Sequence, residues 1–122
     1  MKQRGDAKRM FLYKGKTLEE WVPEAVERVV EHFDPLKVIL FGSLARDEAN
    51  YHSDIDLLVV FSEVEREDKH ALTVEILGVL ADLPAPKDVV VTDLDEIKRR
   101  GDLVGTVLRP ALREGKVLYE RA

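Results

Sequence analysis

The most apolar segment of the chain constrains its fold most strongly. It runs from Leu57 to Phe61 and follows two aspartates, Asp54 and Asp56, that are one residue apart. The segment is apolar on both faces, which is the pattern of a central strand covered on both sides. Carboxylates at the mouth of a buried strand destabilise a fold unless positive charge compensates them. The segment therefore predicts a covered sheet with a charged site at the start of one strand.

A Gly-Ser turn follows the first predicted strand, residues 37–41. Gly42 allows the backbone to approach a ligand closely, and Ser43 is expected to cap a short helix that runs through Arg46. Free N–H groups at the start of such a helix, together with the helix dipole, favour phosphate. Farther along, Ser53 is expected to brace the turn ahead of the aspartates. This stretch predicts a phosphate-binding turn.

The paired aspartates predict a metal site. Side chains at i and i+2 of a strand point to the same face, so Asp54 and Asp56 are expected to project together. Mg²⁺ prefers such hard oxygen ligands and neutralises the pair. Asp88 opens another apolar strand, residues 87–92, and is a candidate third ligand, although it can also be a chance charge at a strand end. Asp-x-Asp alone is common in surface turns, but its combination with the Gly-Ser turn predicts metal-assisted phosphoryl or nucleotidyl chemistry.

Helical periodicity fills the rest of the chain and predicts the α/β (α+β) class. Helices are expected between the strands, and the last strand is expected at an edge of the sheet. The first helix is expected to carry Pro23 in its first turn, despite the capping-box spacing of Thr17 and Glu20. The other expected elements are helices over 65–83, 93–100 and 103–112 (the last with a kink at Pro110) and a strand over 116–119.

The length of 122 residues predicts one domain. We expect a basic N-terminal arm over residues 1–16 and a single domain over residues 17–122. The arm carries six lysines and arginines against one acid, Asp6. Its simplest interpretation is a solvated tail, and the alternative is an arm that contacts a nucleotide, RNA or an acidic partner.

Composition narrows the classes of function. The net charge of −5 argues against broad binding to nucleic acid as the main role. The chain has no cysteine, which excludes disulfides and thiolate metal sites and fits a cytoplasmic location. No apolar run approaches membrane-spanning length, and the N-terminus lacks a secretory apolar region, so we expect no membrane association.

Two motifs together carry a family resemblance. Gly-Ser-x-x-Arg at 42–46 and Ser-Asp-Ile-Asp-Leu at 53–57 resemble the signature of the DNA polymerase beta-like nucleotidyltransferase superfamily. The small size is similar to that of the minimal nucleotidyltransferase (MNT) family, and the resemblance covers nearly the whole chain. It implies a small mixed β-sheet covered by helices. One departure is Asp47, at a position where the family often has glycine.

The resemblance also implies roles for the candidate residues. Asp54 and Asp56 would bind Mg²⁺ that orients the triphosphate of ATP, and Asp88 would hold a second metal ion and help remove the proton of an acceptor hydroxyl. The implied reaction is an in-line displacement at the α-phosphorus, assisted by two metal ions, with pyrophosphate as the leaving group. The residues implied in nucleotide binding are Gly42, Ser43, Arg46 and Ser53.

MNT proteins are similar to the antitoxins of two-gene toxin–antitoxin pairs whose toxin is a HEPN-domain ribonuclease. The resemblance therefore implies transfer of AMP from ATP to a tyrosine of such a toxin, within a possible hetero-oligomer. One alternative is a nucleotidyltransferase that acts on a small molecule or RNA. Another is an antitoxin without catalytic activity, which neutralises its partner by contact alone.

Overall fold

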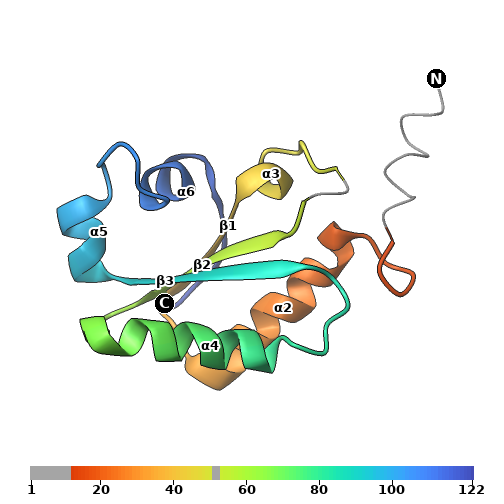
Figure 1. The fold of residues 1–122 in the computed structure, drawn as a ribbon, viewed down its shortest axis with the longest axis horizontal. Helices are drawn as coiled ribbons and strands as arrows, with labels where there is room; N and C mark the ends of the chain where they lie inside the picture. The colour runs from red at the N-terminus through yellow and green to blue at the C-terminus, as the bar shows by residue number, and fades with distance from the viewer. Residues whose placement is uncertain (1–11, 51–52) are drawn as a thin grey trace.

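Four strands form one sheet at the centre of the chain, in the order β3-β2-β1-β4 (Figure 1). The computed structural model describes residues 12–50 and 53–122. β1 runs antiparallel to both β2 and β4, whereas β2 and β3 are parallel. The sheet is therefore mixed, as predicted. In chain order the elements are α2 (Leu18–Phe33), β1 (Lys37–Phe41), α3 (Gly42–Ala45), β2 (Ile55–Phe61), the 3₁₀ helix η1 (Arg66–Asp68), α4 (Lys69–Val79), β3 (Lys87–Asp93), α5 (Leu94–Arg100), α6 (Leu108–Glu114) and β4 (Lys116–Glu120).

The register places the predicted site at one end of this sheet. Asp56 lies opposite Phe41 of β1 on one side and opposite Asp88 of β3 on the other. Side chains that face each other across adjacent strands lie on the same face of a sheet. The end of β1 and the beginnings of β2 and β3 meet here, and α3 follows directly from β1. The topology thus brings segments from distant parts of the sequence to one place.

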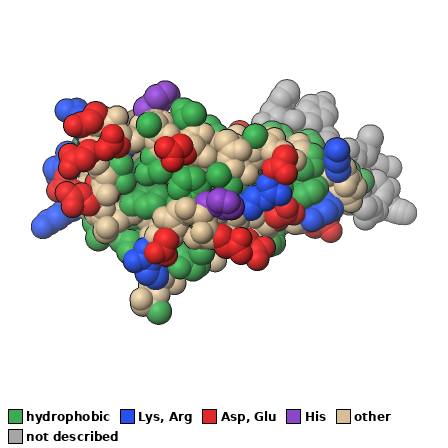
Figure 2. All heavy atoms as spheres, turned by 90° about the horizontal axis from the view of Figure 1, so that it is seen from below, with side chains coloured by type: hydrophobic (Ala, Val, Ile, Leu, Met, Phe, Trp, Pro, Cys, Tyr) green, Lys and Arg blue, Asp and Glu red, His purple; other side chains and the backbone are tan. Residues whose placement is uncertain are grey.

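Helices cover both faces of the sheet. α2 and α4 lie on one side, and α3, α5 and α6 lie on the other (Figure 1). Leu57 and Val59 belong to the main buried cluster beneath α2 and α4, whereas Leu58 and Val60 belong to a smaller cluster with α6. β2 is therefore covered on both faces, as its apolar sequence predicts. By alternation, Asp56 shares the face of the smaller cluster. Figure 2 looks onto the opposite layer, where hydrophobic side chains lie among acidic and basic ones.

The first helix begins earlier than predicted. Thr17 and Glu20 form the complete capping box, and α2 starts at Leu18, so Pro23 lies inside the helix and beyond its first turn. The capping box and the buried face offset the single backbone hydrogen bond that proline removes. The predicted end of the helix is confirmed, because Asp34 adopts the left-handed conformation there.

The later helices are shorter than the sequence pattern predicts. The helix expected over 65–83 consists of η1 followed by α4, which ends at Val79. The helix expected over 103–112 starts only at Leu108. This start leaves Pro110 in the first turn, where a missing N–H costs no hydrogen bond, whereas an earlier start would place the proline in the helix interior. Gly105, with φ of 93°, also interrupts the expected helix.

Part of the predicted basic arm packs against the domain. Tyr13 and Lys16 pair across a tight turn, and Trp21 Nε1 donates a 2.7 Å hydrogen bond to the carbonyl of Tyr13. Lys16 Nζ lies 4.1 Å from the centre of the Trp21 ring. Residues 1–11 of the arm lie outside the described residues. In the described part of the chain, no helix combines the length and the apolar character that crossing a membrane requires.

Candidate active site

Asp54 and Asp56 form the centre of the candidate site. Asp54 directly precedes β2 and Asp56 is its second residue. A side-chain hydrogen bond joins Asp54 and Asp56. Burial, this hydrogen bond and the charges of Asp54 and Asp88 raise the pKa of Asp56 to about 7. The sequence therefore correctly predicts that the two carboxyl groups lie together, and the structure shows that they crowd each other.

No nearby cation of β3 compensates this pair. Lys87 faces Ile55 in the register, one position before the pairing of Asp56 with Asp88, and adjacent residues of a strand point to opposite faces. Its Nζ donates hydrogen bonds to the carbonyls of Leu83 (2.7 Å) and Ala85 (3.1 Å). The cation next to Asp88 in the sequence is thus directed away from the acidic face.

Asp88 is a neighbour of the pair. It pairs in register with Asp56 and its charge contributes to the raised pKa of that residue. Asp88 is exposed, and its Oδ1 accepts a 2.9 Å hydrogen bond from the N–H of Val89. Within residues 12–50 and 53–122, no three His, Asp or Glu side chains are already grouped as metal ligands. Direct contact of Asp88 with a metal ion therefore remains a prediction.

The donor set of the pair fits Mg²⁺. Burial and the neighbouring acids disfavour the ionised form of Asp56, and a divalent cation bound to the ionised pair would relieve the repulsion. Carboxylate oxygens are the ligands that Mg²⁺ prefers, and it usually binds to one or two carboxylates together with substrate phosphates. Asp54 and Asp56 are therefore the residues that would hold such an ion.

Gly42 brings the turn into contact with this pair. Its φ is 80°, and a Cβ atom at this position would lie 2.3 Å from Oδ2 of Asp56. Only glycine therefore permits this close approach without strain. α3 begins at Gly42, and its N-cap residue Phe41 makes no side-chain capping hydrogen bond. The first N–H groups of α3 thus lack a side-chain cap, as a phosphate-binding turn requires.

Ser43 does not cap α3, contrary to the sequence-based expectation, because the helix begins one residue before it. Its hydroxyl instead lies 2.7 Å from Oγ of Ser53. Ser53 is 7% exposed, and its Oγ also accepts a 2.8 Å hydrogen bond from the N–H of Asn50. Ser53 therefore braces the turn ahead of the aspartates, as predicted, and the hydroxyl pair ties α3 to the segment that leads into β2.

Arg46 and Asp47 end the turn. Nε of Arg46 donates a 2.9 Å hydrogen bond to Oε1 of Glu48, and both side chains are largely exposed. In the structure the guanidinium is paired with this acid, so a contact of Arg46 with nucleotide remains a prediction. Asp47 has a φ of 61°. Glycine adopts this left-handed conformation most readily, and aspartate is among the residues that tolerate it.

A second polar cluster lies at the opposite end of β2 and β3, and the sequence gives little sign of it. Asp93 caps α5, and its two oxygens accept 2.9 Å hydrogen bonds from the N–H groups of Val64 and Glu96. Oε1 of Glu96 accepts hydrogen bonds from Thr92 (2.6 Å) and Lys69 (2.9 Å). Only the capping position of Asp93 is readable from the sequence, because Lys69 and Val64 come from another part of the chain.

The family model described as "Nucleotidyltransferase domain" matches residues 22–112. A candidate nucleotidyltransferase from Sulfolobus solfataricus has a similar structure, with a TM-score of 0.61, 24% identity, and coverage of 85% of this chain and 81% of that chain. A search among curated proteins found no significant match.

Two further similar structures are described as toxin–antitoxin complexes. One is a mutant MntA–HpeT complex, with a TM-score of 0.51, 21% identity, and coverage of 82% of this chain and 72% of that chain. The other is a toxin–antitoxin with AMP-PNP, with a TM-score of 0.52, 20% identity, and coverage of 81% and 73%. At these identities the similarity shows a shared fold. The family match spans every candidate site residue, from Gly42 to Asp88. The chain therefore belongs to the nucleotidyltransferase domain family and has the DNA polymerase beta-like nucleotidyltransferase fold.

Proposed function

We propose that this nucleotidyltransferase transfers AMP from ATP to a tyrosine hydroxyl of a partner protein, a HEPN-domain toxin, and so acts as a cytoplasmic antitoxin. The observation that carries the proposal is the crowded pair of Asp54 and Asp56, which lies against the glycine turn that begins α3. This arrangement would join a cation held by the carboxylates to N–H donors suited to phosphate. It is the combination that transfer from a nucleoside triphosphate needs.

Each part of the site has a proposed role. Asp54 and Asp56 would hold Mg²⁺, which when bound neutralises charge on the triphosphate. The N–H groups at Gly42 and Ser43 would bind phosphate oxygens and orient the triphosphate for attack. Asp88 would accept the proton of the acceptor hydroxyl. The acceptor oxygen then bonds to the α-phosphorus, the bond from this phosphorus to the bridging oxygen breaks, and pyrophosphate leaves.

A protein acceptor is favoured over a small molecule or RNA by two of the similar structures. Both are described as toxin–antitoxin complexes, and one of them contains AMP-PNP, an analogue of ATP. The net charge of −5 also disfavours a polyanion as acceptor. These findings support the proposal through the shared fold.

The proposal is tested by transfer of label from ATP. The chain is incubated with ATP labelled at the α-phosphate, Mg²⁺ and the purified product of the adjacent gene. We expect label on one tyrosine of that protein and none with the Asp56→Asn variant. Asp68→Asn is a matched control, because Asp68 is exposed and its side chain makes no capping hydrogen bond at α4. This control should label as the wild type does.

Other outcomes select the alternatives. Label on an RNA end or on a small molecule, with no partner protein present, would favour the second interpretation. If Asp56→Asn protected cells from the partner as well as the wild type does, the antitoxin would act by contact alone. Absence of label on any tyrosine of the partner protein would refute the proposed transfer.

A further inference from the structure

We infer that the acceptor protein docks on the loop between α5 and α6, residues 101–107, which we name the apolar loop. The inference rests on the proposed function and deepens it, because it assigns the surface that brings the acceptor to the site. Three aliphatic side chains of this loop are exposed: Leu103 by 50%, Val104 by 82% and Val107 by 44%. Such a cluster loses contact with water when a partner covers it, and this stabilises the complex.

The local backbone explains why these side chains are not buried within the chain. Their spacing suits one face of a helix, but the helix starts only at Leu108, and Gly105 with φ of 93° holds the preceding segment in turns. The three aliphatic side chains therefore stay exposed to solvent on the folded chain. A partner that packs against them would complete their burial.

Cations surround the apolar loop. Residues 98–116 contain six lysines and arginines and only two acids, whereas the whole chain has a net charge of −5. Lys98, Arg99 and Arg100 form the exposed last turn of α5, where Arg99 pairs with Asp95 at 2.8 Å, and Arg113 is exposed on α6. Arg113 pairs with Asp102 at 3.4 Å, and both side chains are mostly exposed. An apolar centre with a basic rim is complementary to an acidic protein surface that has an apolar pocket.

The loop also lies on the correct side of the sheet. α3, α5, α6 and the loop between the last two helices lie together on one side (Figure 1). Asp56 and Asp88 share the face that carries the smaller cluster, against which α6 packs. The loop follows α5, which begins at the end of β3 opposite to Asp88, so a protein seated on the apolar loop would reach the acids by extending along this same face across α6.

A protein suits this surface better than nucleic acid does. Residues 98–116 contain no aromatic side chain on which a base can stack. Exposed aliphatic side chains gain most from an apolar protein pocket, whereas basic residues alone would serve for phosphate. The occupant we assign is therefore a protein with an acidic surface.

The test compares two valine substitutions. Val104→Asp places a charge at the centre of the apolar loop, and Val74→Asp places the same charge on α4, where Val74 is 54% exposed on the other side of the sheet. Binding of the purified product of the adjacent gene is measured by titration calorimetry, and Mg²⁺-dependent ATP binding is measured separately. We expect Val104→Asp to weaken protein binding by about tenfold or more, whereas Val74→Asp should change it less than twofold. ATP affinity should not change in either variant.

A second variant tests the basic rim. Arg100→Glu should also weaken protein binding, and its effect should shrink as salt is raised. Equal protein binding by Val104→Asp and the wild type, or no binding by the wild type, would overturn the docking inference. If Arg100→Glu and Val104→Asp weakened binding of a single-stranded RNA but not of the protein, the surface would be a nucleic-acid site instead. Binding that depends on Val104 without any transfer of label would support docking and refute the proposed function.

Discussion

The two ends of the β2–β3 pair carry acidic clusters with opposite properties. At the end of β3, Asp93 is 5% exposed, and burial alone would raise its pKa, but hydrogen bonds from the N–H groups of Val64 and Glu96 hold this pKa below its ordinary value. At the beginning of β2, burial and the neighbouring acids raise the pKa of Asp56 to about 7. Among the described residues, the same residue type on the same pair of strands thus has hydrogen-bond donors around it at one end and other acids around it at the other.

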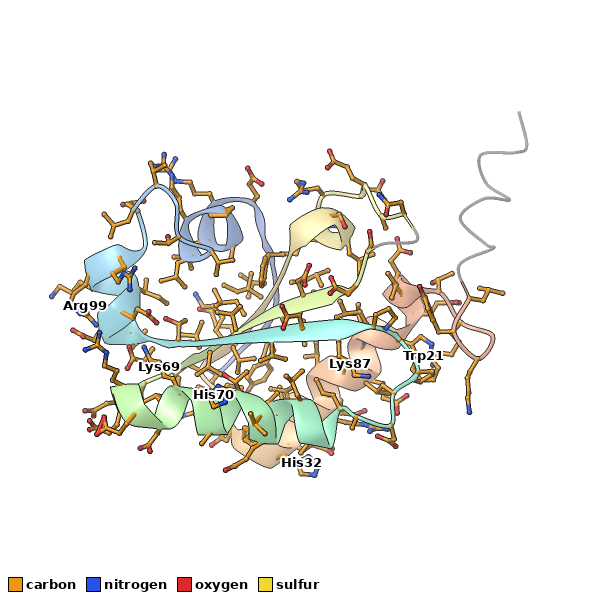
Figure 3. The ribbon with its side chains drawn as sticks, viewed as in Figure 1. Trp21, His32, Lys69, His70, Lys87 and Arg99 are labelled. Carbon is orange, nitrogen blue, oxygen red and sulfur yellow. The ribbon has the colours of Figure 1, made fainter. Side chains whose placement is uncertain are left out.

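The positions of the cations explain the difference. Figure 3 shows Lys69 at one end of the sheet and Lys87 near the other. Lys69 donates to Glu96 and completes the network around Asp93, whereas Lys87 donates to backbone carbonyls. The comparison teaches that hydrogen-bond donors decide whether an acid stabilises this fold. At Asp56 the described neighbours that act on the carboxyl group are the acids Asp54 and Asp88, and their negative charge is available for a cation from solution.

The largest expected effect is on the transfer rate, and it concerns Asp56 at the beginning of β2. Asp56→Asn should lower the rate of nucleotidyl transfer by about 10²–10³-fold or more, because the variant loses a charged ligand for the cation that stabilises the transition state. The free energy of unfolding should not fall, since the substitution removes like-charge repulsion from the pair. Rate measurements with ATP and urea denaturation check both parts. A variant that lost activity only in proportion to lost stability would contradict this role.

A substitution of Asp93, at the end of β3, should affect stability and not activity. Asp93→Ala should lower the free energy of unfolding by about 1–3 kcal/mol, because it removes the cap of α5 and leaves two backbone N–H groups without their acceptor. The transfer rate per folded molecule should stay near that of the wild type. Urea denaturation and active-site titration separate the two quantities. A large loss of transfer in the folded variant would show that the two ends are coupled.

The contrast between the ends also shows what the sequence can predict. Asp54 and Asp56 were predictable because their spacing and the apolar run after them are local, and strand alternation fixes their direction. The network around Asp93 depends on Lys69 and Val64, which only the tertiary fold brings near. The predicted start of the helix over 103–112 was wrong for a different reason, since periodicity alone does not weigh Gly105 and Pro110, which favour the later start at Leu108.

The close approach of the turn to Asp56 gives the next prediction. Gly42→Ala should lower stability by about 2 kcal/mol and weaken Mg²⁺-dependent ATP binding, because its φ is 80° and the added Cβ would lie 2.3 Å from a carboxylate oxygen. Gly15→Ala is the matched control, with φ of 84° and no atom within 4 Å of the added Cβ. The control should show the backbone strain without the effect on ATP. Equal ATP binding by the two variants would show that the close approach of Gly42 to Asp56 does not contribute to ATP binding.

The pH dependence of stability should differ between the two ends. Asp56 has a pKa of about 7 in the folded state and 3.8 as its ordinary value, so the stability that it contributes is present in acid and is lost as pH rises from about 4 to about 7. Allowing for its partial exposure, we expect a fall on the order of 1–2 kcal/mol in the metal-free protein. Asp93 behaves oppositely, because its lowered pKa makes its contribution disappear as pH falls below its ordinary range.

Unfolding curves at several pH values in the presence of a chelator measure this dependence. Asp56→Asn should flatten the decline between about pH 4 and 7, and Asp93→Asn should flatten the decline in acid. Saturating Mg²⁺ should reverse the decline near pH 7, because the cation binds the ionised pair. A wild-type profile that stayed flat between pH 4 and 7 without metal would contradict the raised pKa of Asp56.

The smallest expected effect concerns the hydroxyl pair that joins α3 to the start of β2. Ser53→Ala should lower stability by about 1 kcal/mol, since it removes the bond to Ser43 and the acceptor for the N–H of Asn50. Ser43→Ala should cost less stability, because Ser53 keeps its bond to Asn50. If Ser43 also binds phosphate, its removal should raise KM for ATP more than removal of Ser53 does. The two serines would then differ as the two ends of the sheet do. The hydroxyl of Ser53 would be satisfied by hydrogen bonds within the fold, whereas that of Ser43 would bind a ligand.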